Sequence, residues 1–122
     1  MSGINFLADT NILIFVSQKN PLVEPFLDYN IGISVITEME LLGVFSISKP
    51  QKNAMQKILD QCFIFEFTSE IKLLAIEIKQ RYKIKLPDAI IAATAIVFNI
   101  PLITADADFK SIEELNLIFL ER

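Results

Sequence analysis

The stretch Phe6–Phe15, FLADTNILIF, places a single acid, Asp9, between two apolar segments. Residues 4–8 form a short apolar run suited to a buried strand, and residues 10–18 continue with the length and spacing of a helix. Asp9 therefore stands where an expected strand meets an expected helix. An ionised carboxylate among apolar residues costs free energy unless something pairs with it. The sequence thus predicts a partner for Asp9.

Short apolar runs and helical segments continue to alternate along the chain. Further strands are expected at 31–34, 62–67, 102–104 and 117–120, and helices at 23–29, 37–45, 51–61, 69–81 and 87–99, with Ser34 or Thr37 capping the second of these helices. Strands separated by helices are typical of an α/β fold with right-handed crossovers. We therefore predict one α/β domain over residues 1–122, with a mainly parallel sheet of about four to five strands.

Composition narrows the possible chemistry. The chain contains no histidine, which excludes imidazole acid–base catalysis, Ser-His and Cys-His nucleophiles and histidine-ligated zinc. The single cysteine, Cys62, excludes an internal disulfide framework and favours a reducing cytoplasm. The longest apolar stretch, residues 89–103, is interrupted by polar residues and proline and falls short of the roughly 18 apolar residues of a membrane span. We expect a cytoplasmic protein that acts away from membranes and, if it is an enzyme, works through carboxylates.

Four acids stand where the expected elements begin or end. Asp9 follows the first strand, Glu40 lies just after the second, Asp88 begins a helix after Pro87, and Asp106 follows the fourth strand. Function in parallel sheets collects beyond the carboxyl ends of the strands. The three acids that follow strands are therefore expected to converge there.

Converging carboxylates repel one another, and a hard divalent cation relieves this repulsion. Mg²⁺ or Mn²⁺ takes oxygen ligands, keeps several waters and binds a few carboxylates together with a substrate phosphate. Such an ion lowers the pKa of bound water and supplies a hydroxide nucleophile without histidine. The chemistry that suits these acids is phosphodiester hydrolysis.

Each acid also has a purely structural interpretation. Asp9 can cap the first helix, and Glu40 fits the capping box TEME of residues 37–40. Asp88 can complement a helix dipole, and Asp106 and Asp108 in TADADF can be turn residues. Taken singly, each of these interpretations is favoured. Taken together, they require a coincidence of position that one shared site explains more simply.

The formal net charge of −4 is unusual for a protein that touches nucleic acid. Neutralising the four acids with metal, however, brings the charge from −4 to 0. A basic run of Lys79, Arg81, Lys83 and Lys85 precedes Pro87. This run either steers phosphate towards the site or solvates a helix end and complements its dipole.

Four motifs, in order, resemble those of PIN-domain ribonucleases, and among them of VapC-like toxins of toxin–antitoxin pairs. The motifs are ADTN at 8–11, SVITEMELLG at 34–43, LPDAIIAATA at 86–95 and LITADADF at 102–109. The resemblance covers nearly the whole chain. Carried over by position, the four acids of the family fall on Asp9, Glu40, Asp88 and Asp106, supporting polar positions on Asn11 and Thr104, and an acidic position of some relatives on Asp108.

The resemblance implies a single PIN-like domain built as an α/β/α sandwich. It also implies a Mg²⁺- or Mn²⁺-dependent endoribonuclease, often a homodimer, that is silenced by a cognate antitoxin whose tail covers the active site. Asp9, Asp88, Glu40 and Asp106 would then be both metal ligands and catalytic residues, and RNA the substrate.

Two other classes remain open on the sequence alone. A response-regulator receiver needs an acidic pair after the first strand, where this chain has only Asp9, and the middle strand ends in FEFTSE without the expected phosphoacceptor. A catalytically silent PIN-like module that binds RNA or protein is the more serious alternative. The complete set of acids argues against it.

Overall fold

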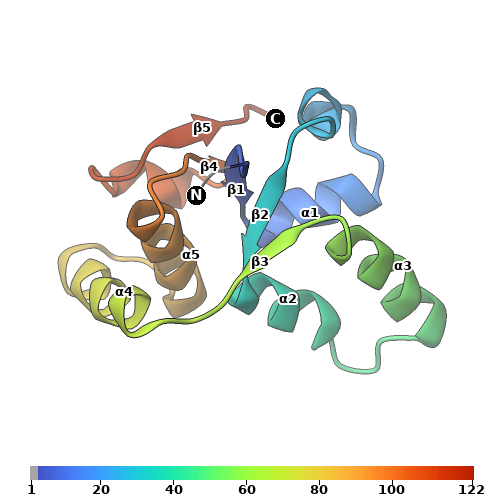
Figure 1. Cartoon of the computed structure of the whole chain (residues 1–122), viewed down its shortest axis with the longest axis horizontal. Helices are drawn as coiled ribbons and strands as arrows, with labels where there is room; N and C mark the ends of the chain where they lie inside the picture. Colours follow the sequence, from blue (N-terminus) through green and yellow to red (C-terminus); the bar gives the residue numbers. More distant parts are fainter. Residues whose placement is uncertain (1–2) are drawn as a thin grey trace.

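Parallel strands form the centre of the molecule. The computed structural model describes residues 3–122, so residues 1 and 2 of the expected domain lie outside the described residues. Its five-stranded sheet has the order β3-β2-β1-β4-β5, and every neighbouring pair is parallel (Figure 1). The strands are β1 (Phe6–Ala8), β2 (Ile31–Ser34), β3 (Phe63–Phe65), β4 (Leu102–Thr104) and β5 (Leu117–Phe119). The predicted α/β fold with a mainly parallel sheet is confirmed.

Helices connect the strands and cover both faces of the sheet. The α-helices are α1 (Thr10–Ser17), α2 (Val35–Leu42), α3 (Lys49–Leu59), α4 (Ser69–Arg81) and α5 (Leu86–Val97). Two short 3-10 helices, η1 (Pro21–Phe26) and η2 (Ala107–Ser111), complete the order. None of the helices in the described part of the chain is both long and apolar enough to span a membrane.

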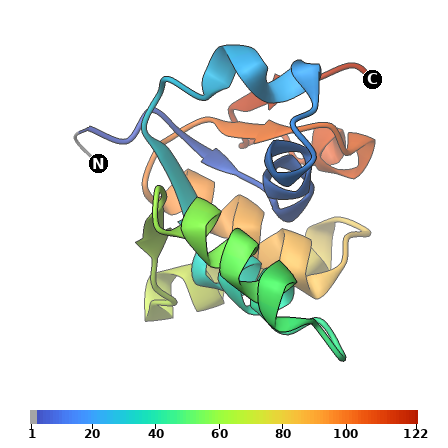
Figure 2. The ribbon, with the colours of Figure 1, turned by 90° about the vertical axis from the view of Figure 1, so that its right-hand side faces the viewer.

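The sheet separates two apolar cores, because successive side chains of a strand point to opposite faces. Leu7 packs in the core that α4 and α5 cover, whereas Phe6 and Ala8 join the core beneath α1 and α3. Figure 1 shows α4 and α5 on one side of the strands and α1 and α3 on the other; α3 faces the viewer in Figure 2. The expected α/β/α sandwich is therefore present.

The strand order places a switch point between β1 and β4. The chain builds outwards from β1 to β2 and β3, then returns to add β4 and β5 on the other side of β1. Connections leave the sheet in opposite directions at such a point, and the crevice beyond the carboxyl ends of the two strands is where α/β proteins bind their ligands. Asp9 directly follows β1, and Asp106 lies two residues beyond β4.

The structure corrects three local expectations. The segment expected to be a helix over 23–29 is the 3-10 helix η1, which contains Pro25; proline lacks the N–H that an α-helix interior needs. Ser34, not Thr37, caps α2, so the capping box proposed for residues 37–40 does not form and the side chain of Glu40 is free for another contact. Helix α2 also ends at Leu42, earlier than expected.

Candidate active site

Asp9 is held by two hydrogen bonds at the carboxyl end of β1. Its Oδ1 accepts a hydrogen bond from the backbone N–H of Ile12 (3.0 Å) and caps α1, while its Oδ2 accepts one from the hydroxyl of Thr104. Only 3% of Asp9 is exposed. Burial raises the pKa of Asp9, and the hydrogen bonds from Thr104 and Ile12 act in the opposite direction. The helix-capping interpretation thus accounts for one oxygen of Asp9, and Thr104 is the partner of the other.

Thr104 links Asp9 to Asp106. It is fully buried at the end of β4, and its hydroxyl oxygen accepts a hydrogen bond from the backbone N–H of Asp106 (3.0 Å) while its proton goes to Asp9. The carboxylate of Asp106 in turn accepts the backbone N–H of Asp108 (2.9 Å) and caps η2. One hydroxyl therefore fixes the acid after β1 relative to the loop after β4.

Asp88 brings a third element to the same place. It is half-buried in the first turn of α5. The pKa of Asp88 is raised to about 6, chiefly by burial and then by the negative charges of Asp106, Asp9 and Glu40, and the cation of Lys85 opposes this rise. Asp88 thus lies within reach of the charges of three other acids, each from a separate segment.

Glu40 is positioned by a residue that the sequence analysis did not single out. The hydroxyl of Thr10 donates to Glu40 Oε1 (2.6 Å), and Thr10 Oγ1 lies 3.1 Å from the hydroxyl oxygen of Thr37. Because the proton of Thr10 points to the carboxylate, Thr37 is the donor of this second bond. The signal was available in the motif ADTN, where Thr10 directly follows the buried acid.

The two remaining polar candidates lie at the margin. Asn11 is exposed in the first turn of α1. Asp108 is exposed in η2, and the acid of this loop whose charge raises the pKa of both Asp9 and Asp88 is Asp106. The geometry therefore groups Asp106 with the other acids and leaves Asp108 beside them.

The four acids offer carboxylate oxygens, which are the type of ligand that a hard divalent cation prefers. Across residues 3–122, no group of three or more Asp, Glu, His or Cys side chains is arranged to hold a metal ion as the side chains stand. The carboxylates of Asp9, Glu40 and Asp106 accept hydrogen bonds from their own neighbours. Mg²⁺ nevertheless needs only one or two protein carboxylates and fills its remaining positions with water and substrate oxygens. Burial is the largest cause of the raised pKa values of Asp9 and Asp88, and neighbouring carboxylate charges raise them as well; a cation would relieve this repulsion.

Comparisons with known proteins agree with this arrangement. The PIN domain family matches residues 6–115. Ribonuclease VapC4 of Mycobacterium tuberculosis is 30% identical over 122 residues, covering 92% of this chain and 94% of the relative. A toxin-antitoxin complex from Klebsiella pneumoniae superimposes with a TM-score of 0.80 at 32% identity, covering 93% of this chain and 96% of the other. VapBC2 from Rickettsia felis, solved bound to a DNA fragment from its promoter, gives a TM-score of 0.78 at 27% identity, covering 97% and 100%. With its sheet order, its four acids and these similarities, the chain belongs to the PIN domain family.

Proposed function

We propose that this chain is a metal-dependent endoribonuclease that hydrolyses RNA phosphodiester bonds and serves as the toxin of a toxin–antitoxin pair. The observation that carries the proposal is the electrostatic coupling of Asp88 to Asp9, Glu40 and Asp106 at the switch point of the sheet. A ribonuclease relative at 30% identity and a toxin-antitoxin complex at 32% identity support it.

Each acid has a role that follows from its setting. Asp9 and Asp88 would hold Mg²⁺ or Mn²⁺, with Glu40 and Asp106 binding it directly or through water. When bound, the ion supplies a Lewis acid for the phosphoryl oxygen and lowers the pKa of a water ligand. Thr104 and Ile12 fix the direction of the Asp9 carboxylate, so this ligand is ordered before substrate arrives.

Glu40 is suited to orient the attacking water. Its carboxylate is exposed and fixed at one oxygen by Thr10, which leaves the second oxygen free to accept a proton or a hydrogen bond from water. A carboxylate that is held in place can act as a general base without histidine. The hydroxyl of Thr104 accepts the backbone N–H of Asp106, which fixes the position of this acid relative to β4.

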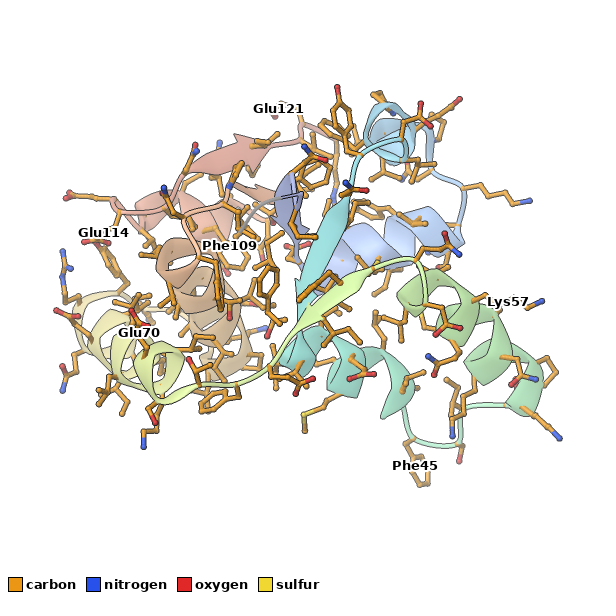
Figure 3. The ribbon with its side chains drawn as sticks, viewed as in Figure 1. Phe45, Lys57, Glu70, Phe109, Glu114 and Glu121 are labelled. Atoms are coloured by element: carbon orange, nitrogen blue, oxygen red, sulfur yellow. The ribbon has the colours of Figure 1, made fainter. Side chains whose placement is uncertain are left out.

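The partners follow from the same proposal. An antitoxin protein and a second copy of this chain would cover apolar surface, and the segment at the end of α2 offers such surface, since Met39 is 61%, Val44 54% and Phe45 96% exposed. Figure 3 shows Phe45 projecting from the loop that follows α2. A nuclease acting on cellular RNA works in the cytoplasm, and the lone cysteine suits that compartment.

The test is cleavage of labelled RNA by the purified full chain with Mg²⁺ or Mn²⁺. Asp9→Asn should abolish cleavage while leaving the domain folded, because asparagine caps a helix as well as aspartate does. Asp28→Asn, an equal change of charge at an exposed position away from these acids, is the matched control. Full activity in Asp9→Asn refutes the assignment, and RNA binding by wild-type protein without cleavage in either metal supports the silent binding module instead.

A further inference from the structure

A basic groove adjoins the N-terminus of α5, which carries Asp88, and η2, which Asp106 caps. It has a volume of 590 Å³ and runs between the α4–α5 connection and η2. The residues that line it are Lys79, Tyr82, Lys83, Ile84, Lys85 and Asp108. The chain has only 11 lysines and arginines against 15 acids, so three lysines along one groove concentrate positive charge in an acidic protein.

The loop that forms this groove is fastened in place. Lys79 Nζ donates to the carbonyl of Ile84 (2.7 Å), which closes the connection between α4 and α5. Arg81 forms an ion pair with Glu114 (2.6 Å), and the hydroxyl of Tyr82 accepts the backbone N–H of Glu113 (3.4 Å). Two of the four cations of the basic run therefore hold the loop itself, and the loop is bound to the segment that precedes β5.

Lys83 and Lys85 are not explained by helix-dipole stabilisation. Both side chains are exposed. Both residues lie outside the last turn of α4, which is the region where the helix dipole would favour a cation. Lys85 is the N-cap residue of α5 and makes no side-chain capping bond. A cation at the positive end of a helix dipole is unfavourable by itself, so an anion beside Lys85 would relieve an existing repulsion.

Each wall of the groove contains a residue from a segment that carries one of the acids. On one wall, Lys85 is the N-cap residue of α5, and Asp88 lies in the first turn of the same helix. On the other wall, the backbone N–H of Asp108 donates to Asp106. The carboxylate of Asp108 repels phosphate from its own wall, so an anionic strand in this groove would lie on the lysine side.

We propose that Lys83 and Lys85 bind the phosphate backbone of single-stranded RNA in this groove, next to the phosphodiester bond that the acids cleave. This inference rests on the proposed ribonuclease function and adds a route for the substrate. The two lysines are binding residues rather than catalytic ones. Their preorganised loop lets them contact phosphate without ordering a flexible segment first.

The experiment measures binding of fluorescein-labelled single-stranded RNA by fluorescence anisotropy, with the full chain carrying Asp9→Asn to prevent cleavage. Each phosphate contact to a single strand contributes about 0.7 to the slope of log K against log salt. Lys83→Gln with Lys85→Gln should therefore reduce the slope by about 1.4, and weaken binding about 60-fold at about 50 mM salt and about 10-fold at about 200 mM. Lys52→Gln with Lys57→Gln in α3 is the control of equal charge; Figure 3 shows Lys57 on the opposite side of the molecule from Glu114.

Equal losses in the two double variants, or no loss in either, would overturn the proposal, because the binding would then not depend on the groove. A DNA strand of the same sequence should lose the same factor, since lysine contacts phosphate; a loss confined to RNA overturns the phosphate assignment. In the active chain, the two substitutions should raise KM and leave kcat nearly unchanged. If the wild-type chain cleaves no RNA but binding still depends on these lysines, the groove stands and the proposed nuclease function falls.

Discussion

Replacing Asp88 by asparagine should stabilise the metal-free domain at neutral pH. The pKa of Asp88 is about 6 in the folded state against an ordinary value of 3.8. A difference of about two pKa units is worth about 3 kcal/mol, and the partial exposure of this carboxylate reduces the figure to about 1.5 kcal/mol. Loss of a favourable charge in the first turn of α5 costs about 0.5 kcal/mol. We therefore expect Asp88→Asn to raise the free energy of unfolding by about 1 kcal/mol.

The stability difference between Asp88→Asn and the wild-type chain should depend on pH, because only the wild-type chain carries the ionisable carboxyl group. Below about pH 3.8 the carboxyl group is protonated in both states and costs no stability. Between about pH 3.8 and 6 the unfolded state loses the proton first, so the cost to the wild-type fold grows, and above about pH 6 the cost is complete. The advantage of Asp88→Asn should therefore be full at pH 7.5 and absent near pH 4.

Urea unfolding in a chelator measures the effect, followed by far-UV circular dichroism because the chain has no tryptophan. Asp108→Asn, an equal charge change at an exposed position of the neighbouring loop, is the control and should change stability by less than about 0.5 kcal/mol. A less stable Asp88→Asn protein at pH 7.5, or a difference that does not vary with pH, would refute the reasoning that mutual repulsion and burial set the properties of this site.

Three further predictions concern the hydroxyl that supports Asp9, the packing against β2 and the cation. Thr104→Val should lower the free energy of unfolding in urea by about 2–3 kcal/mol, because it removes the hydrogen bond to the buried carboxylate of Asp9. Thr104→Ser keeps the hydroxyl and should cost only about 1 kcal/mol. Equal losses in the two variants would contradict the role of the hydroxyl. Gly32→Ala should lower the melting temperature, because a Cβ at Gly32 would lie 2.5 Å from Cε2 of the packed ring of Phe65. Such overpacking typically costs about 1–3 kcal/mol of stability. An unchanged melting temperature would show that the ring moves freely. Adding about 10 mM Mg²⁺ should raise the melting temperature of the wild-type chain through preferential binding to the native state, and should do so less for Asp88→Asn; no shift in the wild-type chain counts against a metal site.

The strands could be predicted well from the sequence because they are buried. The runs at 31–34 and 102–104 are apolar and bounded by polar residues or proline, and the observed strands have those bounds. The 3-10 conformation of η1 was not predicted, since the apolar spacing of residues 23–29 also fits an α-helix and only Pro25 argues against it. The local sequence pattern predicts the position of a helix more reliably than it predicts whether the helix is an α-helix or a 3-10 helix.

The grouping of the acids was predictable in part. Parallel strands bring their carboxyl ends together, which places the residues after β1 and β4 side by side once the sheet exists. The position of Asp88 was not fixed by this rule, because it lies on a helix between β3 and β4, and only the resemblance placed it with the others. The hydrogen bonds from Thr10 and Thr104 depend on long-range packing that residue spacing does not encode.

The two outermost strands of the sheet, β3 and β5, are only three residues long each. A strand this short leaves few unpaired backbone N–H and C=O groups along its open side, so it is a poor template for another chain to extend. Molecules that assemble with this protein must then recognise side chains on its helices and loops rather than add a strand of their own. The short edge strands also disfavour edge-to-edge aggregation of the sheet at high protein concentration.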